Sequence, residues 1–159
     1  MKLNKFFIFG IGILVIASLF FFLKPNTNGF AALDSFDGEV KYYKSLTCGC
    51  CTLHENYLKS KTNLDIKDFS LNDISSIKRQ YGVPQELESC HTIIMGDYFV
   101  EGHIPVEAIE KLMEGKPDIK GIAMPGMPSG SPGMPGAKYG DFVIYAVNND
   151  GSYEEFMRI

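Results

Sequence analysis

Residues 39–61 read EVKYYKSLTCGCCTLHENYLKSK, a strand pattern that runs through three cysteines into a helix pattern. The β-branched and aromatic residues of 39–44 favour a strand. The apolar residues of 50–61 recur at the three- and four-residue spacing of a helix, and Thr47 is its predicted N-cap. The cysteines therefore lie at a junction where a strand ends and a helix begins.

The chain continues to alternate between strand and helix patterns beyond this junction. The predicted elements are a strand at 64–69, a helix that ends at Gly82, strands at 90–95 and 98–101 around a Gly96-Asp97 turn, and a helix at 105–113. The order β-α-β-α-β-β-α is that of a thioredoxin-like α/β fold. Sequential strands joined by helices predict a partly parallel sheet with helices on its faces.

The last part of the chain departs from this order. Residues 115–140 contain seven Gly, five Pro and three Met without a periodic pattern, which is typical of a functional or mobile loop. Strand patterns at 141–147 and 152–157 flank the turn sequence NNDG at 148–151. We therefore expect a thioredoxin-like domain with a Gly/Pro/Met-rich loop and a C-terminal β-hairpin.

The first 24 residues are predicted to lie outside the folded domain. Lys2 and Lys5 precede an apolar run at 6–23, which Lys24 and Pro25 close. The length of the run is close to the roughly 20 residues that cross a bilayer, and the lysines before it favour a cytoplasmic N-terminus. We expect an uncleaved anchor in the inner membrane, with a cleaved signal peptide as the alternative. Both place the rest of the chain in the periplasm or another extracytoplasmic compartment.

The remainder is expected to form a linker at 25–38 and one domain at 39–159. Hydrophobic residues make up 45% of the chain, which is enough to build the core of a single domain. The net charge is −4 and the chain has no block of basic residues. Nucleic-acid binding is therefore not expected.

The chain has four cysteines, Cys48, Cys50, Cys51 and Cys90. Structural disulfides are the ordinary interpretation of cysteines outside the cytoplasm. Neighbouring Cα atoms are about 3.8 Å apart, below the usual disulfide range, so a Cys50–Cys51 bridge would be strained. A Cys48–Cys51 bridge has the familiar two-residue spacing and remains feasible. Three thiols within four residues nevertheless favour a ligand cluster over a structural bridge.

The position of these thiols predicts a metal or redox site. At a helix N-terminus, free N–H groups and the helix dipole stabilise thiolates, which are the form of cysteine that binds metals. In a thioredoxin-like fold the loop before the third strand faces this helix end, and here that loop carries Cys90 and His91. We therefore expect the Cys90 sulfur to lie within a few ångströms of the CGCC cysteines, Cys48, Cys50 and Cys51.

Four motifs resemble a known family: CGCC at 48–51, GVPQELESCHT at 82–92, VEGHIP at 100–105 and MPGMPSGSPGMPG at 124–136. The family consists of small bacterial periplasmic proteins with a thioredoxin-like fold. They are often encoded beside copper-resistance genes and are described as metal-binding, without an established enzymatic activity. The resemblance covers residues 40–159. It implies that the metal site is formed by Cys48, Cys50, Cys51 and Cys90, with His91, His103 and the Met-rich segment as further candidate ligands.

Four more side chains are candidate ligands at the same site. His54 lies three residues after the last cysteine of the CGCC motif and shares its helical face. Relatives commonly have an aromatic residue near this position, so the resemblance assigns His54 no role. The loop adds Met124, Met127 and Met134, which are interpreted as copper(I) ligands, as a lid over the site, or as gap-filling core residues.

Copper(I) is the expected ion, because clustered thiolates with nearby thioethers form a soft ligand set. We predict an extracytoplasmic copper(I)-binding protein for buffering, delivery or resistance. It is not expected to be an enzyme, and its partners are the metal ion and other copper-handling proteins. One alternative is a thiol–disulfide oxidoreductase that uses Cys48 and Cys51 as its exchange pair. Another is a structural zinc site of the Cys3His type.

Overall fold

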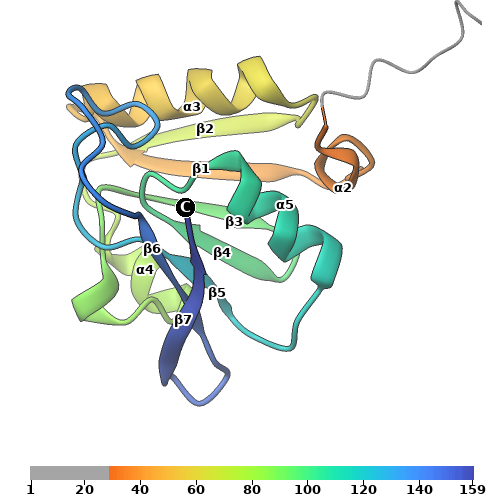
Figure 1. The fold of residues 1–159 in the computed structure, drawn as a ribbon. Helices are drawn as coiled ribbons and strands as arrows, with labels where there is room; N and C mark the ends of the chain where they lie inside the picture. Colours follow the sequence, from red (N-terminus) through yellow and green to blue (C-terminus); the bar gives the residue numbers. More distant parts are fainter. Residues whose placement is uncertain (1–28) are drawn as a thin grey trace, which may run out of the picture.

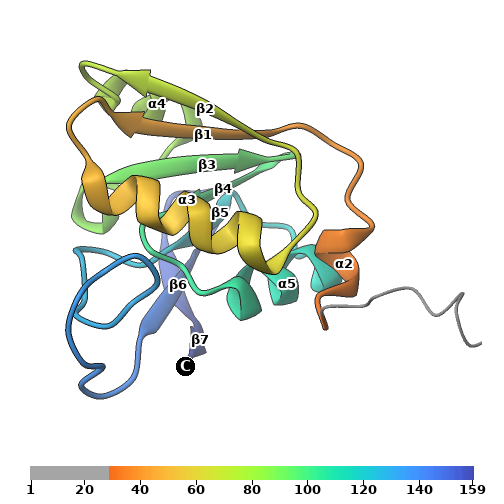
Figure 2. The ribbon, with the colours of Figure 1, turned by 90° about the horizontal axis from the view of Figure 1, so that it is seen from above.

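The computed structural model describes residues 29–159, which form a mixed sheet with helices on both faces (Figure 1 and Figure 2). In chain order the elements are α2 (Ala31–Asp34), β1 (Val40–Ser45), α3 (Gly49–Lys61), β2 (Ile66–Leu71), α4 (Ser75–Tyr81), the 3-10 helix η1 (Gln85–Leu87), β3 (His91–Met95), β4 (Tyr98–Glu101), α5 (Val106–Gly115), β5 (Gly121–Ala123), β6 (Val143–Val147) and β7 (Tyr153–Arg158). The strands lie in the order β2-β1-β3-β4-β5-β6-β7. The β1/β2 and β4/β5 pairs are parallel, and the other pairs are antiparallel.

The α/β fold predicted from the sequence is confirmed, since β1 to α5 follow the order β-α-β-α-β-β-α. Gly82 ends α4 with a φ of 71°, a left-handed conformation that a residue without a Cβ adopts at little cost. Two details differ from the prediction. The N-cap of α3 is Cys48 instead of Thr47. The expected linker at 25–38 contains the short helix α2, whose Leu33 is buried.

Strand β5 lies in the Gly/Pro/Met-rich segment and is absent from the sequence prediction. It pairs in parallel with β4 and antiparallel with β6. The predicted C-terminal hairpin, formed by β6 and β7, therefore extends the main sheet instead of standing apart from it. A strand of three residues is too short to carry an alternating pattern, which is why the sequence does not reveal it.

Alternate residues of the strands face two separate cores. On β1, Tyr42 packs in the larger core, which lies under α3 and α5, and Tyr43 packs in the smaller core on the face of α4. The same alternation applies to β3. His91 stacks on Tyr42, whereas the Thr92 hydroxyl contacts Lys78 of α4. One strand thus contributes neighbouring polar residues to opposite faces of the sheet.

All four sequence motifs gather at one end of the sheet. Strands β1 and β4 end there, and β3, which is antiparallel to both, begins there. Strand β5 runs parallel to β4 and ends there too. The segments beside these strand ends are the CGCC motif at 48–51, Cys90, His103 and Met124. The topology therefore places residues from distant parts of the chain side by side.

The predicted anchor or signal segment, residues 1–24, lies outside the described residues. Within residues 29–159, no helix combines the length and the apolarity needed to cross a membrane. The role of the apolar run at 6–23 stays a prediction.

Candidate metal centre

The four cysteines meet at the N-terminal end of α3. Cys48 is the N-cap of this helix, Cys50 and Cys51 lie in its first turn, and Cys90 directly precedes β3. All four sulfur atoms lie within 4.8 Å of one another. Cys90 reaches the other three, as expected, because β3 begins where β1 ends.

Two of these cysteines are oxidised. Cys48 and Cys51 form a disulfide with their Cα atoms 5.4 Å apart, whereas Cys50 and Cys90 are free. The Cys50 sulfur lies 3.5 Å from the Cys48 sulfur. The group therefore has two chemical forms: a reduced form with four thiols, and an oxidised form with one disulfide and two thiols.

The protein environment differs between the cysteines of α3 and Cys90. The first turn of α3 offers unpaired backbone N–H groups and the positive end of the helix dipole, which favour thiolates. Cys90 is half-buried in the loop before β3, and desolvation together with the nearby Cys50 raises its pKa to about 12. Cys90 therefore carries a proton at neutral pH, and an ion that binds its sulfur displaces that proton.

Three histidines lie beside Cys90 in the interior. His54, His91 and His103 are each 0% exposed. Their ring centroids are 4.7 Å apart for His54 and His91, 4.8 Å for His91 and His103, and 5.3 Å for His54 and His103. Desolvation lowers the pKa of all three, and that of His54 falls to about 4. The rings are therefore neutral at physiological pH, which is the form that ligates metals.

Both ring nitrogens of His54 have protein partners. Nε2 lies 2.9 Å from the carbonyl oxygen of Ile104, which can only accept, so this nitrogen carries the proton. Nδ1 then carries a lone pair and lies 3.1 Å from the Tyr42 hydroxyl. That hydroxyl has one proton, which Nδ1 shares with the Cys51 carbonyl oxygen at 2.9 Å. Because neither nitrogen is free, His54 fits a structural role that joins α3, β1 and the start of α5.

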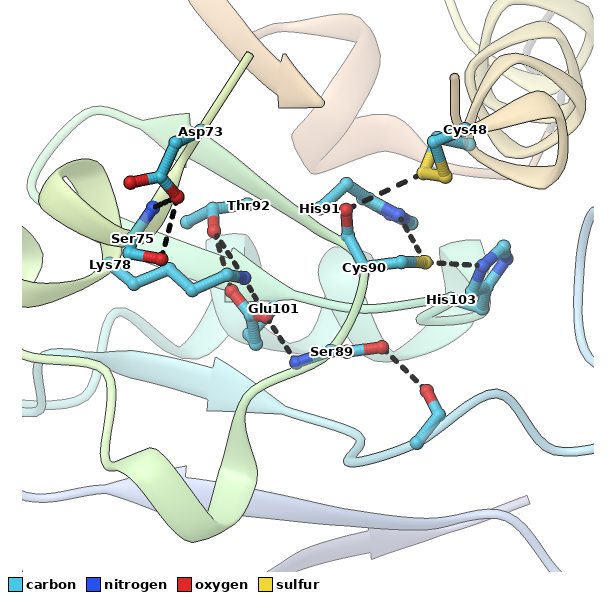
Figure 3. Close-up of polar contacts among 12 residues, drawn as sticks. Cys48, Asp73, Ser75, Lys78, Ser89, Cys90, His91, Thr92, Glu101 and His103 are labelled. Carbon is cyan, nitrogen blue, oxygen red and sulfur yellow. Dashed lines mark hydrogen bonds and ion pairs between the residues drawn. A yellow bond between two sulfur atoms is a disulfide. The ribbon is translucent and has the colours of Figure 1, made fainter. Parts of the chain in front are cut away.

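His91 and His103 both direct a nitrogen at the Cys90 sulfur (Figure 3). His103 Nδ1 donates to the Pro132 carbonyl oxygen at 2.7 Å, which leaves the Nε2 lone pair facing the sulfur at 3.0 Å. His91 Nδ1 lies 3.5 Å from the same sulfur. Within residues 29–159, His91 Nε2 is buried without a hydrogen-bond partner. These are the two imidazoles that the fold leaves available for an ion.

The Gly/Pro/Met-rich loop packs over this end of the sheet. Pro132 provides the carbonyl group that orients His103. At the neighbouring Gly133, whose φ is 80°, an added Cβ would lie 2.6 Å from the backbone nitrogen of His54. Only glycine therefore lets the loop lie this close to α3. Figure 1 shows the loop beside the N-terminal end of that helix.

The three methionines of the loop have different surroundings. Met124 is 1% exposed and belongs to the larger core, which fits its interpretation as a gap-filling residue. Met134 is half-buried, and Met127 is 52% exposed. A ligand role for these thioethers stays a prediction.

A buried ion pair on the opposite face of the sheet holds the Cys90 loop. Lys78 of α4 is paired with Glu101 at the end of β4, and their side chains are 4% and 0% exposed. The Glu101 carboxylate also accepts from the Thr92 hydroxyl and from the backbone N–H of Ser89, both at 2.6 Å (Figure 3). The residue before Cys90 is thus fixed. The sequence pattern misses this network because a single lysine on a polar helix is normally a surface residue.

Comparisons with known proteins show which families and structures the chain resembles. The family model described as "Protein of unknown function, DUF411" matches residues 87–134, which include Cys90, His91 and His103. The solved structure titled "Copper resistance protein copG- Form 1" has a TM-score of 0.69 and 31% sequence identity, and the match covers 76% of this chain and 96% of that one. For "Copper resistance protein copG- Form 2" the TM-score is 0.70 and the identity 32%, with 76% and 97% covered. No curated protein matches the chain.

Proposed function

This chain belongs to the family of the copper resistance protein copG, and from that premise we propose that it binds copper(I) outside the cytoplasm for buffering, delivery or resistance. The observation that carries the proposal is the convergence of four sulfur atoms within 4.8 Å of one another. Thiolates are soft ligands that select copper(I) over harder ions. The resemblance inferred from the four sequence motifs is confirmed by the comparisons.

The reduced cysteines are the proposed ligands. Cys48, Cys50 and Cys51 lie at a helix N-terminus that favours their thiolates, and Cys90 closes the group from the opposite side. His91 and His103 lie against Cys90 and are proposed to complete the site. The Cys48–Cys51 disulfide has to be reduced before all four sulfurs are available. An extracytoplasmic position, a membrane anchor in residues 1–24 and copper-handling partner proteins complete the proposal.

The direct test is a titration of the reduced chain with copper(I) in competition with a chromophoric chelator. Replacing Cys48, Cys50 and Cys51 together by Ser should weaken copper(I) binding by more than about 100-fold, or about 3 kcal/mol. The exposed neighbour Thr52 provides a matched control, because Thr52→Ser alters the same helical turn without removing a sulfur. Equal affinity of the triple variant and the control would refute the proposal.

The Cys48–Cys51 disulfide favours a second candidate function, thiol–disulfide exchange. In that reaction a substrate dithiol would be oxidised to its disulfide while the Cys48–Cys51 bridge is reduced to two thiols. The measurement is oxidation of a dithiol peptide by one equivalent of the oxidised chain, with Cys48→Ser and Cys51→Ser as inactive controls. Oxidation no faster than with the controls would exclude this function.

A further inference from the structure

One buried side chain, Tyr42 of β1, contacts two of the segments that carry candidate metal ligands. Its hydroxyl lies 2.9 Å from the carbonyl oxygen of Cys51, in the first turn of α3. Its ring stacks on the ring of His91 at the start of β3, with the centroids 4.8 Å apart. The Tyr42 side chain is 0% exposed, so bulk water does not compete for either contact.

His54 extends these contacts to a third segment. Its Nδ1 lies 3.1 Å from the Tyr42 hydroxyl, and its Nε2 donates to the carbonyl oxygen of Ile104 at 2.9 Å. Ile104 directly follows His103 in the chain. A series of hydrogen bonds therefore leads from the first turn of α3 to the segment that carries His103.

We propose that Tyr42 is a positioning residue for the copper(I) site and acts with His54 to hold the cysteines of α3 opposite the candidate histidine ligands. The inference rests on the proposed function, and it adds a role for two residues that bind no ion. The Tyr42 hydroxyl and both His54 nitrogens have protein partners, so neither residue offers an atom to the metal. Their contribution is the geometry between the two groups of ligands.

The two groups of ligands need such a connection because they stand on different elements. Three cysteines belong to the start of α3, whereas Cys90, His91 and His103 lie beside the ends of β3 and β4. Helix α3 packs on the sheet through apolar residues such as Leu58, and apolar packing has no preferred direction. A hydrogen bond, in contrast, weakens steeply outside its preferred geometry. The Tyr42 hydroxyl therefore restricts how far α3 can slide along the sheet.

Tyr57 provides an internal comparison, because it also links α3 to the start of α5. Its hydroxyl accepts from the backbone N–H of Val106 at 3.1 Å. Tyr57 lies further along α3 than the cysteines, and its hydrogen bond involves neither a candidate ligand nor a residue next to one. A specific role for Tyr42 therefore predicts that removal of the two hydroxyl groups has different effects on metal binding.

The test measures the copper(I) affinity of the reduced full chain in competition with a chromophoric chelator. Tyr42→Phe keeps the ring that stacks on His91 and removes only the hydroxyl. It should weaken copper(I) binding by about 10-fold or more, the usual loss when a residue that orients a metal ligand is removed. Tyr57→Phe, which removes a hydrogen bond between the same helix and the start of α5, should bind copper(I) as the unchanged chain does.

Substitutions at position 54 test whether the hydrogen bonds themselves are needed. His54→Leu removes both of them and should weaken copper(I) binding as Tyr42→Phe does. His54→Gln supplies an amide N–H for the Ile104 carbonyl oxygen and an oxygen for the Tyr42 hydroxyl, so it should restore most of the affinity. If Tyr42→Phe does not fold, this pair of variants decides the question.

Copper-edge X-ray absorption of the loaded chains adds a measurement that a loss of stability alone would not change. It counts the sulfur and nitrogen neighbours of the ion. We expect both kinds of neighbour in the unchanged chain. In Tyr42→Phe we expect fewer nitrogen neighbours, because the histidines are no longer held against the start of α3.

Circular dichroism of the metal-free chains shows whether each variant is folded. Equal affinity and equal nitrogen counts in Tyr42→Phe and the unchanged chain would overturn this inference and leave the proposed function intact. An equal loss of affinity in Tyr57→Phe would also overturn it, because any hydrogen bond between α3 and α5 would then suffice. An unchanged chain that does not bind copper(I) would refute the proposed function, and this inference would fail with it.

Discussion

At the scale of single residues, the three buried histidines differ in the hydrogen bonds that their ring nitrogens make. His54 has both nitrogens engaged, His103 has one nitrogen engaged and one free, and His91 has a buried nitrogen without a partner in the described part of the chain. The side chains are chemically identical, and their positions relative to Cys90 and backbone carbonyls create the differences. All three are kept neutral by burial, which links the stability of the fold to pH.

The metal-free chain should lose stability as the pH falls from 6.5 towards 4. Burial lowers the pKa of His54 from 6.5 to about 4, so between these values the unfolded chain binds more protons than the folded one. The free energy of unfolding then decreases with falling pH, and at pH 5 the loss is about 2 kcal/mol for His54 alone. Urea denaturation at about pH 7.5 and about pH 5 measures the loss. His54→Gln should show a smaller loss, and an unchanged loss would contradict the assignment.

Removing one partner of the buried ion pair should strongly destabilise the protein. Glu101→Leu leaves Lys78 charged in the interior and removes the acceptor for the Ser89 N–H. Breaking a buried pair in this way costs about 3–5 kcal/mol. Glu101→Gln keeps a side-chain oxygen for Ser89, so it should cost less and should retain more copper(I) affinity. Urea denaturation measures both variants, and a Glu101→Leu protein as stable as the parent chain would refute the role of the pair.

At the scale of elements, the loop between β5 and β6 packs against the candidate metal centre. It is anchored at Gly126, whose carbonyl oxygen accepts from the Ser89 hydroxyl at 2.5 Å, and at Pro132, which holds His103. Between these contacts and α3 the packing is close enough to require a glycine at position 133. The composition of the loop therefore reflects its fit against α3.

Gly133→Ala should destabilise the protein more than Gly126→Ala. Both glycines have positive φ, of 80° and 70°, so the backbone strain of the substitution is shared. The new Cβ at 133 would meet the His54 backbone nitrogen at 2.6 Å, whereas the one at 126 would have no atom within 4 Å. Overpacking of this kind costs about 1–3 kcal/mol. Thermal unfolding of the two variants measures the difference, and equal values would show that the loop does not press on α3.

At the scale of the whole molecule, the sheet brings Cys90 and the CGCC cysteines together at one of its ends. Helix α2 packs at the opposite end of the sheet. The N–H groups of Ala32 and Leu33 donate to the Glu110 carboxylate of α5, each at 2.9 Å. Leu33 is 1% exposed and packs in the larger core. The folded unit therefore includes part of the segment that the sequence assigns to a linker.

A chain that starts at residue 29 should be more stable than one that starts at residue 36. The shorter chain lacks α2, and full burial of a leucine contributes about 1.5–3 kcal/mol. Urea denaturation of the two truncated chains measures this difference. Leu33→Ala in the longer chain serves as the control, because it removes most of the apolar contact and keeps the backbone. Equal stability of the two chains would place the domain boundary after α2.

The sequence by itself was sufficient for the order of the elements from β1 to α5, because alternation, helical spacing and Gly82 are local signals. It also placed the cysteines at a strand-to-helix junction and Cys90 opposite them, because strand order in such a fold brings the two loops together. Strand β5 was missed because three residues carry no period.

The tertiary structure alone decided what each polar side chain contacts. Spacing and composition do not reveal these contacts. They are the burial of Lys78 against Glu101, the partners of both His54 nitrogens and the Pro132 carbonyl oxygen that accepts from His103. A periodic pattern reports which face of an element a residue occupies. A hydrogen-bond partner depends on which distant segment the folded chain brings to that face, and this is fixed only when the sheet and its loops are assembled.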